Sequence, residues 1–281
     1  MALPDFLIIG AMKCGTSTLY AQLASQAGVF MTTPKEPNFF SDDDVFARGP
    51  DWYRELFKDA ANGDLKGEAS THYTKLPTYP QTVSRMKNLL AAPKLIYMIR
   101  NPVERAVSHY IHERSEGRME NDPVAAFWRH EELVDYGRYA MQIAPFIDAF
   151  GTGQIFLTSL EQLKTAPGAE LARITGFLGL ATAPIWRPEL ATQNVSAERV
   201  RRLPLHRILV DNPVASALRR ALVPKAIRTR IRNARSIGSR PELPDDLRAR
   251  LQDIYAKDHL ELARLFPGNA AVAASFSVSG T

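Results

Sequence analysis

A glycine-bounded loop near the start of the chain carries residues suited to hold an anion. Gly10 and Gly15 bracket four residues that include Lys13 and Cys14, and the hydroxyl run Thr16–Thr18 follows. The apolar run before the loop reads as a buried strand, and the residues after it have a helical pattern. The N–H groups of a first helical turn lack intrahelical partners, and the helix dipole favours negative charge there. The loop is therefore predicted to cradle a phosphate.

The same loop departs from the loop of nucleoside triphosphatases. The spacing of Gly10 and Gly15 fits the front half of that motif, which then requires Lys and a magnesium-binding Ser or Thr. Here Thr16 takes the position of that Lys, and Lys13 lies inside the loop. The pattern favours an anion held without a metal-bound triphosphate. The alternative is a surface turn with incidental glycines.

A second strand end carries a second cationic group. The buried run 95–99 ends at Arg100, and Asn101 and Pro102 are suited to cap and begin a helix that presents Ser108. In an open parallel sheet, ligands bind beyond the carboxyl ends of the strands. We therefore expect both cationic groups on one edge, which indicates a ligand with two separated anionic groups.

Several expected features of a metal-dependent phosphotransferase are absent. Such enzymes usually end a neighbouring strand with an Asp that helps to hold magnesium, whereas this strand ends with Arg100. His109 and His112 lie three residues apart, but the sequence offers no third ligand at metal-binding spacing. We expect no metal, and charge stabilisation by cations and N–H groups. A P-loop kinase remains the rival enzyme class.

The order of apolar runs predicts the fold class. Strands at 6–9, 65–69, 95–99 and 155–158 alternate with helices at 16–26, 81–90, 103–113, 124–133, 139–150, 171–178 and 247–265. This alternation predicts an α/β protein with a P-loop-type parallel sheet flanked by helices on both faces. We expect a single domain over 1–267, with an arginine-rich segment at 199–240 that covers the cofactor or the acceptor. The tail 268–281, rich in small residues, is expected to be disordered.

The composition is that of an ordinary soluble enzyme. The chain has 281 residues, 45% of them hydrophobic and 23% charged, with one cysteine. A net charge of +5 and a pI near 9.3 suit an anionic ligand or weak contact with a membrane surface. No aromatic residues interleave with the basic stretch, so we expect no nucleic-acid partner. Without a signal peptide or a transmembrane run, a cytoplasmic location is expected.

Three motifs in order carry a family resemblance. Lys13–Ser17, the segment Lys35-Glu36-Pro37-Asn38-Phe39-Phe40, and Arg100-Asn101-Pro102 with Ser108 resemble sulfotransferases that use 3′-phosphoadenosine 5′-phosphosulfate (PAPS). The branch most resembled contains heparan-sulfate sulfotransferases and their bacterial relatives. The resemblance runs from about Pro4 to Leu180 and is weaker beyond.

The resemblance implies roles for individual residues. Lys13 and the loop through Cys14, Gly15, Thr16, Ser17 and Thr18 would hold the 5′-phosphosulfate, and Arg100 with Ser108 would hold the 3′-phosphate. Glu36 would be the general base. From the arginine-rich segment, Arg199, Arg201 and Arg202 are the candidates to reach the nucleotide. The chain departs from the family at Ala69, where those enzymes carry a functional lysine, and nearby His72 could share the basic role.

The chemistry implied is transfer of a sulfuryl group to a hydroxyl, or an amine, of a carbohydrate, lipid or secondary metabolite. Lys13 would neutralise charge on the leaving phosphate, and the product would be 3′-phosphoadenosine 5′-phosphate (PAP). The non-enzyme alternative is a nucleotide-binding module. The sequence leaves open the acceptor, the choice between O- and N-sulfation, and the oligomeric state.

Overall fold

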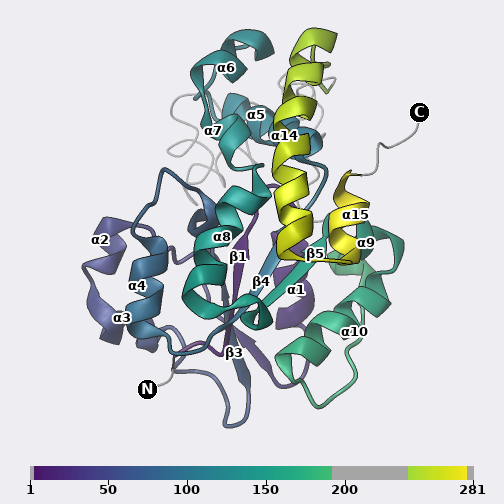
Figure 1. Cartoon of the computed structure of the whole chain (residues 1–281). Helices are drawn as coiled ribbons and strands as arrows, with labels where there is room; N and C mark the ends of the chain where they lie inside the picture. Colours follow the sequence, from purple (N-terminus) through teal and green to yellow (C-terminus); the bar gives the residue numbers. More distant parts are fainter. Residues whose placement is uncertain (1–2, 192–239, 277–281) are drawn as a thin grey trace, which may run out of the picture.

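A parallel five-stranded sheet forms the centre of the molecule (Figure 1). The computed structural model describes residues 3–191 and 240–276. The strand order is β2-β3-β1-β4-β5, and each neighbouring pair is parallel. The strands are β1 (Phe6–Gly10), β2 (Val29–Met31), β3 (Leu65–Ala69), β4 (Lys94–Ile99) and β5 (Ile155–Ser159).

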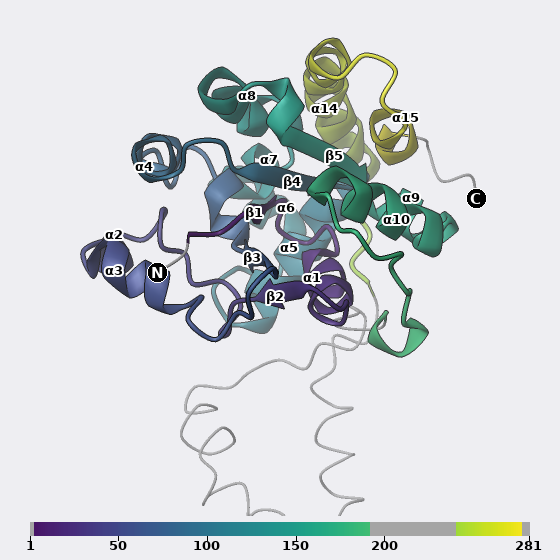
Figure 2. The same cartoon turned by 90° about the horizontal axis from the view of Figure 1, so that it is seen from below.

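Helices cover both faces of this sheet, which confirms the predicted fold class. Figure 2 shows α4 and α8 on one side of the strands, and α1 and α10 on the other. The helices are α1 (Thr16–Ala24), α2 (Asp43–Phe46), α3 (Gly49–Glu55), α4 (Thr82–Leu89), α5 (Pro102–Ser115), α6 (Pro123–Arg129), α7 (Glu132–Asp135), α8 (Tyr139–Phe150), α9 (Leu160–Thr165), α10 (Pro167–Leu178), α14 (Asp245–Leu265) and α15 (Ala270–Phe276). Three short 3₁₀ turns are η1 (Thr71–Thr74), η2 (Thr152–Gln154) and η3 (Pro188–Leu190).

The central position of β1 follows from its sequence. All five of its residues are buried, as expected for a strand that is covered on both faces and has no polar alternation. It pairs with β3 on one side and β4 on the other, so three strand ends meet at one place. The loop after β1 is joined directly to β4, because Ala11 N–H donates to the Met98 carbonyl at 2.7 Å.

The C-terminal tail differs from its prediction. Instead of being disordered, Ala270–Phe276 forms α15, which packs against β5 and α9. Small residues make this close packing feasible, since Ala271 and Val272 are buried in the core. Composition alone indicated disorder because it does not reveal a docking surface. Residues 277–281 and the candidate arginines Arg199, Arg201 and Arg202 lie outside the described residues.

Two smaller differences concern element boundaries. The single helix expected at 124–133 is divided into α6 and α7, because His130 has a non-helical backbone. The three-residue strand β2 was not predicted, since it is too short to show a pattern. Within the described residues, no helix is both long and apolar enough to cross a membrane.

Candidate active site

The loop after β1 has a backbone shaped by close packing. A Cβ at Gly10 would lie 1.9 Å from Oγ1 of Thr74, whose hydroxyl donates to the Ile9 carbonyl at 2.9 Å. Lys13 and Gly15 both have positive φ, at 69° and 93°. Helix α1 then begins without a side-chain cap at Gly15. An uncapped helix start that follows a tight loop is a suitable anion cradle, so this part of the site fits a phosphate.

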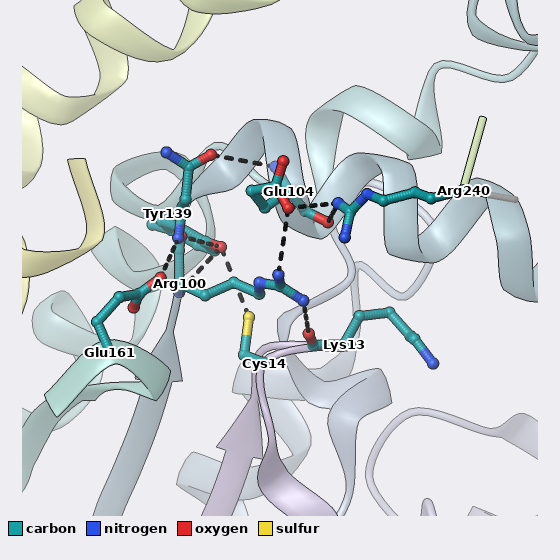
Figure 3. A network of polar contacts seen from close by, with 8 residues as sticks. Lys13, Cys14, Arg100, Glu104, Tyr139, Glu161 and Arg240 are labelled. Carbon is teal, nitrogen blue, oxygen red and sulfur yellow. Dashed lines mark hydrogen bonds and ion pairs between the residues drawn. The ribbon is translucent and has the colours of Figure 1, made fainter. Parts of the chain in front are cut away.

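Arg100 joins this loop from the end of β4, as Figure 3 shows. Its Nη1 donates to the Lys13 carbonyl at 3.3 Å, and its Nη2 lies 3.7 Å from a Glu104 carboxylate oxygen. The Arg100 Nε is buried and has no hydrogen-bond partner among the described residues. In the same view the Lys13 side chain extends away from Arg100. The prediction that the two cationic strand ends meet is confirmed.

Cys14 occupies a different position from the one expected for a nucleotide contact. Its thiol is fully buried beneath the loop, 3.5 Å from the Tyr139 hydroxyl, and its N–H donates to the Ala11 carbonyl. Burial raises the pKa of this thiol to about 11, although the Tyr139 hydrogen bond opposes the shift. The polar groups of Cys14 are therefore used inside the protein, and we assign it to the support of the loop.

A cavity of about 650 Å³ brings most of the predicted site residues together. Its lining includes the β1 loop, the residues after β3, and one face of α5. The predicted residues that line it are Lys13, Gly15, Thr16, Ser17, Thr18, Glu36, His72, Arg100 and Ser108. Cys14 is absent from this lining. Two cationic strand ends and a carboxylate thus share one cavity.

Glu36 is held in a strained and well-connected loop. Its φ is 60°, and its N–H donates to the Ala69 carbonyl at the end of β3 at 3.0 Å. One carboxylate oxygen lies 2.7 Å from Lys35 Nζ, and the other accepts from the Thr71 hydroxyl at 3.2 Å. Burial raises the pKa of Glu36, but Lys35 and other nearby cations lower it more, so the net shift is downward. Glu36 is consequently ionised at neutral pH.

His72 lies beside Glu36 but is kept neutral. Burial and, to a smaller extent, the charge of Lys75 lower its pKa to about 4, against the opposing effect of Glu36. Its ring stacks on Tyr79 with centroids 4.8 Å apart, and its Nδ1 is buried without a hydrogen-bond partner among the described residues. The structure therefore places a neutral imidazole next to a charged carboxylate.

Four further cationic residues that the motifs did not indicate line the cavity, namely Lys75, Arg118, Lys164 and Arg240. Two of them are closest to the predicted residues in their burial or their ion pairs. Lys75 follows η1 and is only 8% exposed. Arg240 comes from the end of the arginine-rich segment and forms an ion pair with Glu104, which also faces Arg100 (Figure 3). The sequence shows the positive charge of this segment, but the expected candidates lie at its other end, at 199–202. No sequence signal distinguished Lys75.

A parallel sheet that brings a glycine-bounded loop, an arginine at a neighbouring strand end and a carboxylate into one cavity defines an α/β protein of the P-loop type. Comparison with known families narrows the class. The family described as "Sulfotransferase domain" matches residues 3–261, and the chain belongs to that family.

Known proteins agree with this membership. The chain is 30% identical over 187 residues to mouse heparan sulfate glucosamine 3-O-sulfotransferase 3B1, covering 63% of this chain and 46% of that protein. It is 27% identical over 202 residues to human bifunctional heparan sulfate N-deacetylase/N-sulfotransferase 2, covering 63% and 22%. The chain thus spans less than half the length of either relative.

A solved structure shares nearly the whole fold. The sulfotransferase from Alicyclobacillus acidocaldarius superposes with a TM-score of 0.66 at 24% identity, covering 94% of this chain and 96% of that one. At this identity the likeness shows the fold alone.

Proposed function

We propose that the chain transfers a sulfuryl group from PAPS to a hydroxyl, or an amine, of a carbohydrate, lipid or secondary-metabolite acceptor. The observation that carries this proposal is the contact between Arg100 and the Lys13 carbonyl at the rim of a cavity that also contains Glu36. In this proposal Lys13 and Arg100 would form two adjacent anion sites, and Glu36 would supply the base. Family membership supports the reaction class.

The cradle residues account for binding of the donor. The first-turn N–H groups of α1 and the side chains of Lys13, Thr16 and Ser17 would surround the 5′ end. Arg100 and Ser108, which both line the cavity from the β4 end and α5, would hold the 3′-phosphate. The Arg100 Nε is buried and has no hydrogen-bond partner in the part of the chain that the structure describes, which supports this role, since a buried donor gains most from a charged acceptor.

The transfer end would use Glu36 and Lys13. PAPS, when bound, supplies an activated sulfuryl group on a phosphate leaving group. Glu36 would take the proton of the attacking hydroxyl, and its ionised state at neutral pH suits that role. Lys13 would stabilise the negative charge that grows on the leaving phosphate. His72 is neutral and could accept a hydrogen bond from the acceptor.

The acceptor stays open within these classes. The two relatives described above act on heparan sulfate by name. This chain has Ala69 where the resembled enzymes carry a lysine. We therefore expect less positive charge beside the bound acceptor at this position than in those enzymes. A cytoplasmic location, weak contact with a membrane surface, and one domain over 1–267 remain predictions from the sequence.

The deciding experiment measures binding of PAP, ADP and ATP by thermal shift without added metal. The proposal expects PAP to stabilise the protein most, because only PAP carries both the 5′- and the 3′-phosphate. A larger shift with ATP, dependent on magnesium, would instead favour the kinase alternative. Binding of PAP without transfer to any acceptor in a broad screen would favour a nucleotide-binding module.

A further inference from the structure

Lys75 is fixed to the phosphate cradle by hydrogen bonds on both sides of it. The preceding residue, Thr74, donates its hydroxyl to the Ile9 carbonyl of β1. The following residue, Leu76, exchanges two hydrogen bonds with the amide of Gln142 at 2.7 and 2.8 Å, and Gln142 is fully buried in α8. The Lys75 backbone therefore has a set position relative to the loop that carries Lys13.

The side chain of Lys75 is almost fully buried, and its ammonium is unpaired within the described part of the chain. The residue is 8% exposed, and its Nζ has neither a hydrogen bond nor an ion pair there. Its Nζ lies over the Tyr136 ring, 5.6 Å from the ring centroid. Burying a charge without a partner is costly, so such a group at a cavity wall indicates a ligand oxyanion.

The groups around Lys75 place it near the transfer end of the cavity. Burial is the largest effect on the Lys75 pKa, and the net shift is downward. Glu36 and Glu113 raise this pKa, whereas Arg105 and Arg118 lower it. Neither carboxylate is within the 4.0 Å of an ion pair. Lys75 therefore lies in the field of the proposed base without being neutralised by it, and it lines the same cavity as Lys13.

We propose that Lys75 binds the oxygens of the sulfuryl group of PAPS. This inference rests on the proposed function and adds a residue that the motifs do not contain. During transfer the bond from sulfur to the bridging phosphate oxygen breaks, and a bond from the acceptor oxygen to sulfur forms. The acceptor proton goes to Glu36, and Lys75 keeps its protons throughout. Its ammonium provides charge-assisted hydrogen bonds to the group in motion.

PAPS and PAP differ only in the sulfuryl group, so their relative affinity tests the proposal without knowledge of the acceptor. We would measure both dissociation constants by calorimetry for the wild-type protein and for Lys75→Met, which keeps the length of the side chain. The wild type should bind PAPS more tightly than PAP. Lys75→Met should weaken PAPS by about 10- to 100-fold and PAP by less than about 3-fold.

Lys164→Met is the matched control, because it removes the same charge from an exposed lysine in the same cavity lining. It should leave the ratio of the two affinities unchanged. Lys75→Arg, which keeps the charge, should restore part of the preference for PAPS. If Lys75→Met does not fold by circular dichroism, Lys75→Gln replaces it.

The inference would be overturned if Lys75→Met had the same ratio of PAPS and PAP affinities as the wild type, whether or not both affinities fall. Failure of the wild-type protein to bind PAP would instead overturn the proposed function itself. The two failures are thus distinguishable.

Discussion

At the scale of single residues, Glu36 is a largely buried carboxylate whose charge is stabilised by the neighbouring Lys35. Replacing it by Gln keeps the shape of the side chain but removes the base. Glu36→Gln should lower kcat by about 10²- to 10⁴-fold and leave the dissociation constant of PAP nearly unchanged, because the carboxylate acts on the acceptor. Steady-state kinetics and calorimetry check this, with Glu55→Gln on the surface of α3 as the control. Unaltered turnover would remove Glu36 from the mechanism.

Lys13 and Arg100 touch through one backbone carbonyl, yet we expect different kinetic effects. Lys13→Ala should mainly lower kcat, by about 10²- to 10³-fold, because its charge matters most in the transition state. Arg100→Ala should mainly weaken PAP binding, by about 10- to 100-fold, through loss of a charged hydrogen bond. Calorimetry with PAP and initial-rate kinetics separate the two. Equal loss of both parameters in both variants would contradict the separate roles.

The burial of the Lys75 side chain also has a consequence for stability. Its pKa falls from 10.5 to about 8 on folding, mainly by burial, so the unfolded chain binds more protons between these values. Stability attributable to Lys75 should therefore rise with pH across that window. At pH 7, Lys75→Met should be more stable than wild type by about 1–3 kcal/mol, and the gap should close towards pH 10.5.

Urea unfolding of both proteins at pH 7 and pH 10 measures this gap, and Lys164→Met serves as the exposed control. If the difference in unfolding free energy between Lys75→Met and wild type is the same at both pH values, the charge of Lys75 is not its cause.

The sequence predicted the site residues that belong to local motifs. That Lys13 and Arg100 share a cavity could be predicted because Lys13 lies in the loop after one buried strand and Arg100 directly follows another, and parallel strand ends share an edge. Lys75 and Arg240 were missed because tertiary packing alone brings them to the cavity. Gln142 of α8 positions the chain beside Lys75, and Arg240 reaches α5 from a part of the chain far along the sequence.

At the scale of elements, η1 packs closely against the end of β1, where Thr74 contacts Gly10. Because a Cβ on Gly10 would meet the Thr74 hydroxyl, Gly10→Ala should lower stability by about 1–3 kcal/mol. In the double variant Gly10→Ala/Thr74→Ala, part of that loss should be recovered, since the clashing atom is removed. Thermal unfolding of both single variants and the double variant gives the coupling energy. Simple additivity would show that the contact is not responsible.

Element prediction succeeded for segments of both types, although neither of the following two is uniformly apolar. The strand at Leu65–Ala69 and the helix at Tyr139–Phe150 match their expected bounds. It failed at the junction of α6 and α7 and at α15, because the conformation of such short segments depends on the elements that pack against them. A three-residue strand such as β2 gains its identity from pairing with β3, which no local pattern can show.

At the scale of the whole molecule, the C-terminal helix closes one border of the sheet. β5 is the last strand in the order, and α15 packs against it and against α9. Ending the chain before Gly268 should lower the melting temperature by several degrees, because buried Ala271 and Val272 are removed, and should promote association through the uncovered border. Calorimetry and light scattering test this, with removal of 277–281 as the control. An unchanged melting temperature would show that α15 is dispensable.

The thiol beneath the β1 loop has a practical consequence. Cys14 is the one cysteine of the chain, it is fully buried, and its pKa is raised to about 11, so an alkylating reagent finds it in an unreactive form. Modification then requires the loop to lift off Tyr139. The rate of labelling therefore reports how often this loop opens, without any engineered cysteine, and a nucleotide that tightens the loop should slow it.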